Sequence, residues 1–413
     1  MAVEDKKYQL GTAENKAFLD AARDNLLNFG TKFPAPDGSS YWLGDDGTPW
    51  KDRNRATWIT CRMTHVYCLG AFVGFPGAEE LVDAGLKGLK GALHDDVNDG
   101  WYPEITPEGG YTPTKQCYAH AFVLLASSSA TLLGRPGAAE LLDHAEKVFL
   151  DKFWDDETGL SVDTWNTEFT ELDPYRGLNA NMHSVEAFLA VADVTGDETW
   201  RKRAGRIIEH VLGWAKANNW RIPEHFHSDW SLDLECNREK PDDQFKPYGA
   251  TPGHGIEWAR LITQWANQHL SVRSGGRVPV HRRRGASVQP CGRGCVERGR
   301  CARPRIHHRL GRQARRARPY ALDAGQGINT SSTLARVTGK ESYAKWYATF
   351  LEYADSTVMD HVNGSWFHQL DRTNQPIGTV WPGKSDLYHA TQSMMIPLRD
   401  PSLSIAPAAK KQG

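Results

Sequence analysis

The sequence lacks the long apolar runs of a membrane protein. No uninterrupted apolar stretch approaches the roughly 18 residues needed to cross a bilayer. The first residues, MAVEDKKYQL, are charged and do not form the apolar centre of a secretory signal. The seven cysteines are odd in number and show no disulfide-like spacing, which suits a reducing compartment. We therefore expect a cytoplasmic protein without membrane contact.

Motifs for nucleotide cofactors and for metals are also missing. No GxGxxG follows a strand pattern, and no GxxxxGK[ST] is present. His254 and Glu257 resemble half of a metal-binding helix motif, but neither HExxH nor CxxC accompanies them. We therefore expect neither a cofactor nor a metal ion.

Tryptophan is abundant, with 15 among 413 residues. The net charge is −1 and 40% of residues are hydrophobic, which is enough to bury a large core. An indole ring can fill such a core, and it can also stack on the apolar C–H face of a sugar. Most individual tryptophans are expected in the core.

Helical periodicity runs through the first 270 residues and resumes near residue 328. Helices that are apolar almost all round, such as CYAHAFVLLASSSATLL, alternate with amphipathic ones, such as AAELLDHAEKVF. A wholly apolar helix is buried on every side, whereas an amphipathic helix faces water. Two concentric rings of helices, an α/α toroid, satisfy both patterns, and a four-helix bundle would leave about half of the helices unplaced.

Polar side chains recur on the helices that are otherwise apolar, where they are costly unless paired. An arginine there needs an anion or several acceptors, and sugar hydroxyls can serve. A lone helical histidine is more often a satisfied core residue, so no single position decides the function. The candidates are Trp58, Arg62 and His65; Asn179, His183 and Glu186; His254 and Glu257; and His389.

Five separated motifs together resemble the N-acylglucosamine 2-epimerase superfamily. They are TWITCRMTHVY, YRGLNANMHSVEAFL, TPGHGIEW, NGSWFHQLD and VWPGKSDLYH. The resemblance covers residues 20–270 and 327–400, and it is closest to the branch of mannose and sulfoquinovose isomerases. It implies an all-α, single-domain (α/α)6 barrel over residues 1–413, and cofactor-free conversion of aldoses and ketoses.

The resemblance also implies catalytic roles. His389 transfers a proton between C2 and C1 of the sugar. His254 serves ring opening, or proton transfer on the opposite face in 2-epimerising relatives. Glu257 orients His254 or a hydroxyl. A histidine suits this work because its pKa lies near neutrality.

Five further residues are implied to bind the sugar. His183 and Asn179 bind hydroxyls, and Arg62 holds the O1/O2 region. Trp58 and Tyr118 wall the pocket. A non-catalytic sugar-binding module would keep Trp58 and Arg62 but would not need two histidines and a glutamate.

The motifs do not separate an isomerase from a 2-epimerase, because both use the same two histidines. Local resemblance (RMTHVY, HFHSDW, DLYH) favours the isomerase. Sulfosugar enzymes of this branch have Arg and Gln where this chain has Gln244, His368 and Ser385. Because this chain lacks the arginine that would pair with a sulfonate, an anionic sugar is not the expected substrate. We therefore expect D-mannose and D-fructose as partners, with lyxose-like sugars as an alternative, for a monomer or homo-oligomer.

An arginine-rich stretch at 281–319 does not fit this picture. Fifteen arginines and no lysine fall between residues 271 and 320, with Glu297 the only acid. A basic stripe is the footprint of nucleic-acid binding, the alternative from another class. However, Gly, Pro and Cys interrupt this stripe in place of aromatics, and its cysteine spacing matches no zinc finger. We expect no nucleic-acid partner.

Arg, Gly, Pro, Ala and Cys without Lys are typical of a GC-rich gene translated out of frame. We interpret residues 271–326 as a compensated frameshift. Shifted by one base, the codon of Leu322 permits Trp, and the restored codon of Gln326 permits Glu. Trp and Glu four apart resemble the pocket of the family. The chain as written is then expected to lack both, to lose an inner-helix segment, and to be poorly active or unstable.

Overall fold

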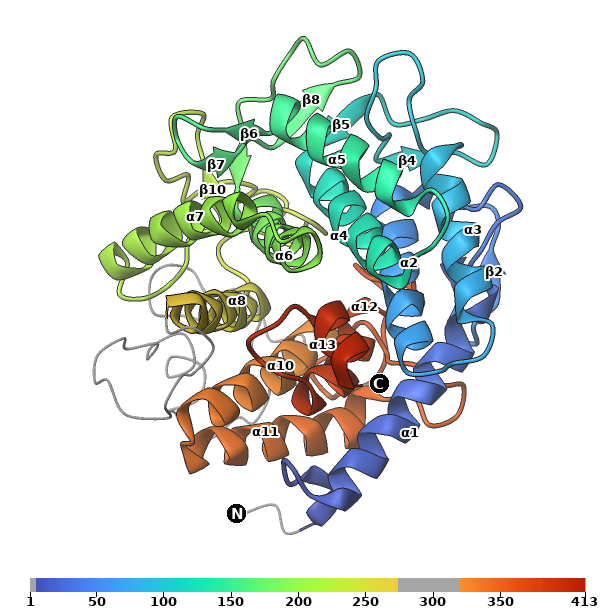
Figure 1. The fold of residues 1–413 in the computed structure, drawn as a ribbon, viewed down its shortest axis with the longest axis vertical. Helices are drawn as coiled ribbons and strands as arrows, with labels where there is room; N and C mark the ends of the chain where they lie inside the picture. Colours follow the sequence, from blue (N-terminus) through green and yellow to red (C-terminus); the bar gives the residue numbers. More distant parts are fainter. Residues whose placement is uncertain (1–4, 274–319, 413) are drawn as a thin grey trace.

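The computed structural model describes residues 5–273 and 320–412, so the arginine-rich stretch at 281–319 lies outside the described residues. The described helices form two concentric rings, as Figure 1 shows down the ring axis. The inner ring contains α2 (Thr57–Phe72), α4 (Cys117–Leu133), α6 (Leu178–Thr195), α8 (Pro252–Arg273), α10 (Ala321–Thr338) and α12 (Tyr388–Met395). The outer ring contains α1 (Ala13–Phe29), α3 (Ala78–Lys90), α5 (Ala138–Lys152), α7 (Glu198–Ala217) and α11 (Glu341–Tyr353).

Burial separates the two rings as the hydrophobic pattern predicts. Every residue of α2 from Thr57 to Gly70 is buried. Its outer neighbour α3 buries one face, including Val82, Leu86 and Leu89. The expected (α/α)6 barrel is therefore confirmed. None of the helices in the described ranges is both long and apolar enough to cross a membrane.

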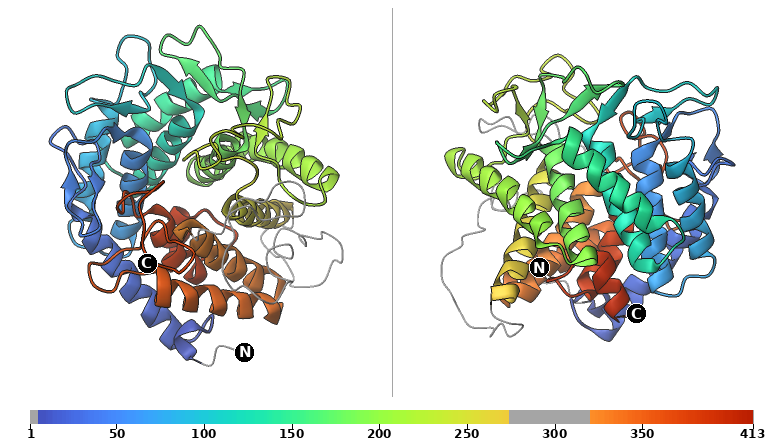
Figure 2. Two further views of the ribbon diagram at one scale, coloured as in Figure 1. Left: turned by 180° about the vertical axis from the view of Figure 1, so that it is seen from behind. Right: turned by 45° about the horizontal axis from the view of Figure 1, so that its top comes forward.

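Short two-stranded antiparallel sheets gather where the inner helices begin (Figure 2, right). They pair β1 (Trp42–Leu43) with β2 (Pro49–Trp50), β3 (Arg55–Ala56) with β4 (Glu104–Ile105), β5 (Thr114–Gln116) with β8 (Thr164–Asn166), β6 (Trp154–Asp155) with β7 (Leu160–Ser161), and β9 (Arg176–Gly177) with β10 (His225–Phe226). Two of these sheets, β1–β2 and β6–β7, are hairpins, and this end of the barrel is called the hairpin end. The sequence patterns did not predict these strands. Because β3, β5 and β9 run directly into α2, α4 and α6, they fix where these inner helices start.

The opposite end of the barrel is closed by α13 (Ile405–Gln412), which contacts α2, α4 and α6. Ala406 and Ala409 pack there against Leu69 and Met395. Short turns of helix at Lys6–Tyr8, Gly30–Lys32, Ala354–Val358 and Ile396–Leu398 complete the described elements. With one end filled by α13, the open end of the barrel is the hairpin end.

The expected loss of an inner-helix segment near residue 326 is not seen. Helix α10 begins at Ala321 and continues to Thr338 without interruption. Ala, Leu and Gln are good helix formers, so residues 321–326 have adequate helix propensity whatever their origin. The backbone of this segment is helical, but several of its side chains fit poorly into the cavity wall, as described below.

Candidate active site

The first turns of the inner helices surround one cavity at the hairpin end. The second and sixth residues of each helix lie four apart and therefore share a face. These pairs are Trp58 and Arg62 on α2, Tyr118 and Phe122 on α4, Asn179 and His183 on α6, Gly253 and Glu257 on α8, and Leu322 and Gln326 on α10. On α12 the second residue is His389. Residues far apart in sequence thus meet at the cavity because they occupy equivalent positions in the first turns of the inner helices.

The cavity has about 980 Å³ of empty space, its open mouth included. Seven of the eight residues expected from the sequence line it: Arg62, Tyr118, Asn179, His183, His254, Glu257 and His389. Such a mixture of aromatic walls with a few polar groups is typical of a small-molecule site.

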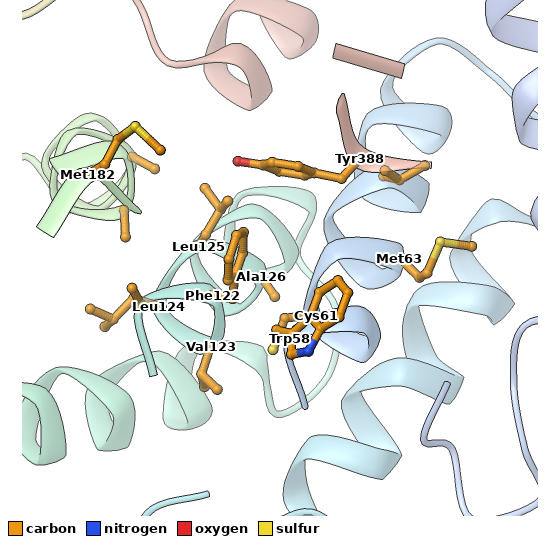
Figure 3. Packing of buried hydrophobic residues seen from close by; sticks show 14 of the residues in the cluster. Trp58, Cys61, Met63, Phe122, Val123, Leu124, Leu125, Ala126, Met182 and Tyr388 are labelled. Atoms are coloured by element: carbon orange, nitrogen blue, oxygen red, sulfur yellow. The ribbon is translucent and has the colours of Figure 1, made fainter. Parts of the chain in front are cut away.

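Trp58 is the exception, because it lies behind the lining. Its ring packs against Phe245 at 5.9 Å and Trp381 at 6.2 Å, and the guanidinium of Arg62 lies 4.8 Å from it. Figure 3 shows Trp58 on α2 near Phe122, with Tyr388 reaching across from α12. Phe245 and Trp381, on loops without periodicity, are the aromatic walls that the sequence patterns missed.

Arg62 is held by the anion that a buried arginine requires. Its Nη1 donates to Asp386 Oδ2 at 3.2 Å and its Nη2 donates to the Tyr118 hydroxyl at 2.9 Å. The side chains of Arg62 and Asp386 are almost wholly buried, so the pair is strongly coupled. Arg62 therefore presents a fixed cation and Tyr118 a fixed ring to the cavity.

His254 is supported by a carboxylate that the sequence patterns did not reveal. Its Nδ1 lies 3.0 Å from Oε2 of Glu224, a buried residue just before β10. The backbone N–H of Thr251 donates to the other oxygen of Glu224. Burial opposes the charged imidazolium, but the negative charge of Glu224 and its hydrogen bond raise the pKa of His254. Glu224 therefore favours the protonated form of His254.

Glu257 does not contact His254 Nδ1, since Glu224 occupies that position. Its Oε1 accepts from Arg260 at 3.4 Å, and its Oε2 is buried with no hydrogen-bond partner among the described residues. An unpartnered buried carboxylate oxygen at a cavity wall is costly unless a ligand donates to it. Of the two roles expected for Glu257, the geometry favours binding a hydroxyl.

His183 belongs to a buried ionic network on the same wall. Its Nδ1 lies 3.2 Å from Glu186 Oε2, which also accepts from the Tyr388 hydroxyl. The other oxygen of Glu186 accepts from Arg260 and Gln392, each at 3.2 Å. Burial would raise the pKa of Glu186, but His183 and Arg260 hold it well below its usual range.

His183, Glu186 and Glu257 also have ligand atoms within 4.8 Å of one another, as a metal site would. Arg260, however, donates to both carboxylates from a buried position. A fixed cation on two of the three ligands opposes a second cation. The group is therefore an ion network that orients the His183 ring toward the cavity.

The Nδ1 atom of His389 contacts an amide, whereas that of His254 contacts a carboxylate. Its Nδ1 lies 3.1 Å from Nε2 of Gln326. The amide can donate to Nδ1 or, rotated, accept from an Nδ1–H group, so it serves either tautomer. Burial lowers the pKa of His389 well below its ordinary value, and the charges of Arg62 and His183 add to this effect. His389 is accordingly neutral at physiological pH.

The start of α10 carries side chains that fit their surroundings poorly. Leu322 lines the cavity with a small aliphatic group between polar residues. Both carboxylate oxygens of Asp323 are buried without a hydrogen-bond partner in the described ranges, and burial raises its pKa to about 7. Oε1 of Gln326 is likewise buried and unpartnered there. These misfits fall where the sequence predicts out-of-frame residues.

The positions that would recognise a sulfonate carry no fixed cation. Gln244 and His368 line the cavity, and burial lowers the pKa of His368, which keeps it neutral. Ser385 is buried, with its hydroxyl unpartnered in the part of the chain that the structure describes. The adjacent Lys384 is wholly buried and its Nζ binds Asp360 at 2.6 Å, so its charge is neutralised.

Comparison with known proteins finds relatives over most of the chain. A family model described as N-acylglucosamine 2-epimerase matches residues 38–280 and 322–393. The unmatched gap includes the whole arginine-rich stretch at 281–319. A protein from Thermobifida fusca named D-mannose isomerase is 39% identical, over 97% of this chain and 98% of its own length. Another of that name from Pseudomonas cannabina pv. alisalensis is 38% identical, over 89% and 88% of the two chains.

Solved structures show the same fold. A crystal structure titled D-mannose isomerase superposes with a TM-score of 0.81 at 22% identity, over 93% of this chain and 97% of that one. A cellobiose 2-epimerase from Spirochaeta thermophila DSM 6192 superposes with a TM-score of 0.76 at 16% identity, over 93% and 96%. The family model matches most of the residues of this chain, and the solved structures share its fold. The chain therefore belongs to the N-acylglucosamine 2-epimerase family.

Proposed function

We propose that the chain is an aldose–ketose isomerase that interconverts D-mannose and D-fructose by proton transfer through an enediolate, without a cofactor. Relatives named D-mannose isomerase match it at 38–39% identity over most of its length. The observation that carries the proposal is that two histidines line one cavity, His254 paired with the carboxylate of Glu224 and His389 with the amide of Gln326. These surroundings raise the pKa of His254 and burial lowers that of His389. Such a divergence is how one site supplies both an acid and a base.

The first step of the proposed reaction opens the sugar ring. His254, protonated through its pairing with Glu224, donates its proton to the ring oxygen as the bond from C1 to that oxygen breaks. The anomeric hydroxyl releases its proton to solvent water, from which His254 takes one back. The product is the open-chain aldehyde, with its carbonyl at C1.

The second step moves one proton between carbons. Neutral His389 takes the C2 proton, the C2–H electrons form the C1=C2 bond, and the C1=O electrons move onto O1 to give an enediolate. The O2 proton then passes to O1, the electrons left on O2 form C2=O, and C1 takes back the proton from the His389 imidazolium. Arg62 supplies a nearby positive charge that stabilises the enediolate.

The remaining polar lining supplies hydroxyl recognition. Asn179 and His183 stand on one helix face, and Glu257, whose buried Oε2 is unpartnered among the described residues, lines the same cavity. Tyr118, Phe245 and Trp381 give apolar surface for the C–H face of the sugar. With no fixed cation at Gln244, His368 or Ser385, a neutral hexose suits the cavity better than a sulfonated one.

The proposed setting is a cytoplasmic enzyme with one catalytic domain, as a monomer or homo-oligomer, acting on a free sugar and not on nucleic acid. Cys61, Cys68 and Cys117 are buried free thiols, which fits a reducing compartment. A salt-dependent gel shift with the full chain tests the nucleic-acid alternative.

The deciding experiment incubates the purified chain with D-mannose and follows D-fructose by chromatography. Fructose formed ahead of any glucose supports the isomerase. Glucose formed first identifies a 2-epimerase, which the same two histidines also permit. If this chain and its Leu322→Trp/Gln326→Glu variant both form neither fructose nor glucose, the isomerase and the 2-epimerase hypotheses are both contradicted.

A further inference from the structure

A second cluster of potential ligands lies outside the cavity, on the outer side of the barrel. His94 and Asp99 belong to the loop between α3 and β4, and His144 projects from α5. Asp99 Oδ1 lies 3.3 Å from His94 Nε2 and 2.7 Å from His144 Nε2. Two imidazole nitrogens thus converge on one carboxylate oxygen, and none of the three residues lines the cavity.

These distances are close to those of a tetrahedral metal site. Metal–ligand bonds of about 2.0–2.1 Å place tetrahedral ligands roughly 3.3–3.4 Å apart. The His94–Asp99 separation of 3.3 Å already meets that value. The His144–Asp99 separation needs a small opening, which the partly exposed His144 and Asp99 side chains allow. All three ligand atoms lie within 4.8 Å of one another.

The surroundings hold the ligands in place as a metal site requires. Nδ1 of His94 lies 2.8 Å from Asp96 Oδ1, which leaves Nε2 directed at Asp99. A carboxylate on the far nitrogen of a ligating histidine is the usual second contact of such sites. The rings of both histidines pack 5.4 Å from Trp101, which is wholly buried.

Charge and access also favour a cation. The carboxylates of Asp96 and Asp99 are partly exposed, at 90% and 48% of their side chains. Lys115 Nζ donates to Asp95 Oδ2 at 2.7 Å and to the backbone carbonyl of Asp99 at 2.6 Å, so it fixes the loop without pairing with the Asp99 carboxylate. Asp99 Oδ1 also accepts from the backbone N–H of Gly100 at 2.6 Å. Asp99 has a φ of 69°, in the left-handed region that Asp and Asn tolerate better than most residues.

We propose that His94, His144 and Asp99 form a binding site for a divalent transition-metal ion such as Zn²⁺, with water completing the coordination. Two imidazoles and one carboxylate select zinc-like ions over Mg²⁺ and Ca²⁺, which prefer all-oxygen sites. The ion ties the α3–β4 loop to α5. This site is independent of the isomerase chemistry, so neither proposal depends on the other.

The test uses the tag-free full chain, stripped with a chelator and titrated calorimetrically with ZnCl₂ and with MgCl₂. Asp99→Asn removes the ligand charge while keeping a residue that tolerates the left-handed backbone. His144→Ala removes one imidazole. His227→Ala, an exposed histidine near β10, is the matched control. Melting temperature is recorded with and without zinc to verify folding and stabilisation.

We expect one zinc ion per chain, at least about tenfold weaker binding in both site variants, and parental binding in the control. Zinc should raise the melting temperature of the parent and the control only, and turnover of mannose should not change at site-saturating zinc. Equal zinc affinity in all four proteins would overturn the proposal. So would zinc inhibition that persists unchanged in both site variants, since the ion then lies at the cavity histidines.

Discussion

His254 and His389 reach the same cavity from α8 and α12, but their second nitrogens meet different groups. His254 Nδ1 faces the carboxylate of Glu224 at 3.0 Å, whereas His389 Nδ1 faces the amide of Gln326 at 3.1 Å. The carboxylate raises the pKa of His254, while burial and neighbouring cations lower that of His389. In the proposed mechanism, this difference makes His254 the acid and His389 the base.

The strongest way to break this comparison is to remove the base. His389→Ala should lower turnover of mannose by about 10²–10⁴-fold, the contribution of a positioned general base. His254→Ala should also be severe, because ring opening loses its acid. Steady-state kinetics with mannose measures both.

His65→Ala is the control for that pair of variants. His65 is buried but lies outside the cavity lining, with Nδ1 bonded to Ser129 at 2.7 Å. Its loss should lower the melting temperature but leave turnover near the parental value. Near-native turnover in His389→Ala would refute the assignment of the base.

The next largest effect concerns the charge of the substrate. Mannose should exceed a 6-sulfonated hexose in kcat/KM by about 100-fold, because a sulfonate would be desolvated beside Gln244, His368 and Ser385 without an arginine partner. The ratio of the two specificity constants measures it. A preference for the sulfonated sugar would place this chain in the other branch of the family.

Glu224→Gln tests this comparison because the Nδ1 atoms of both histidines would then face an amide. The proposed mechanism requires neutral His389 and protonated His254, so kcat/KM should be bell-shaped in pH. Without the charge of Glu224 the pKa of His254 falls, and the alkaline limb should move to lower pH by about one unit, with roughly tenfold less activity at pH 8.

The exposed Glu239, replaced by Gln, is the matched control for Glu224→Gln and should leave the pH profile unchanged. An alkaline limb that does not move in Glu224→Gln would show that His254 is not the acid.

Restoring the expected residues of α10 should improve the site. In Leu322→Trp/Gln326→Glu, a carboxylate can only accept from the Nδ1–H of His389, which frees Nε2 as the base and raises the pKa of His389 toward neutrality. We expect roughly tenfold higher kcat/KM and an acid limb shifted to higher pH. The exposed Gln375, replaced by Glu, should have neither effect.

Resequencing the gene across codons 265–330 tests the origin of this segment. Two compensating single-base changes are expected. A confirmed sequence without them, together with a fully active purified protein of this mass, would make the arginine-rich stretch a genuine insert.

Asp323→Thr, the residue permitted in the shifted frame, should have the smallest effect. The pKa of Asp323 is raised by burial to about 7, so the free energy of unfolding falls as pH rises from about 4 to about 7. Removing the carboxyl should raise the melting temperature by about 2–4 °C, more at pH 8 than at pH 5. Calorimetry at the two pH values measures it, and a gain larger at pH 5 would contradict this account.

Much of this architecture could be predicted because it follows from periodicity. The burial of α2 and α4 on all sides and the one-sided burial of α3 and α5 produce patterns that the sequence displays. Site residues four apart on one helix, such as Asn179 and His183, are equally visible.

Loop residues escaped prediction because they follow no period. Glu224, Asp386, Phe245 and Trp381 hold or wall the site from loops, and their neighbours in space are far away in sequence. The strands at the hairpin end are two or three residues long, too short to show alternation. The peripheral pair His94 and His144 is brought together only by the packing of α5 beside the α3–β4 loop.

Nuclear magnetic resonance of D-mannose incubated with the chain in D₂O tests the central claim most directly. A single proton carried between C2 and C1 by His389 predicts D-fructose as the product, with deuterium entering C1 of fructose and C2 of recovered mannose. In His389→Ala this exchange should disappear. Deuterium at C2 of newly formed glucose, ahead of any fructose, would contradict the account, because it would show reprotonation of C2 from the opposite face.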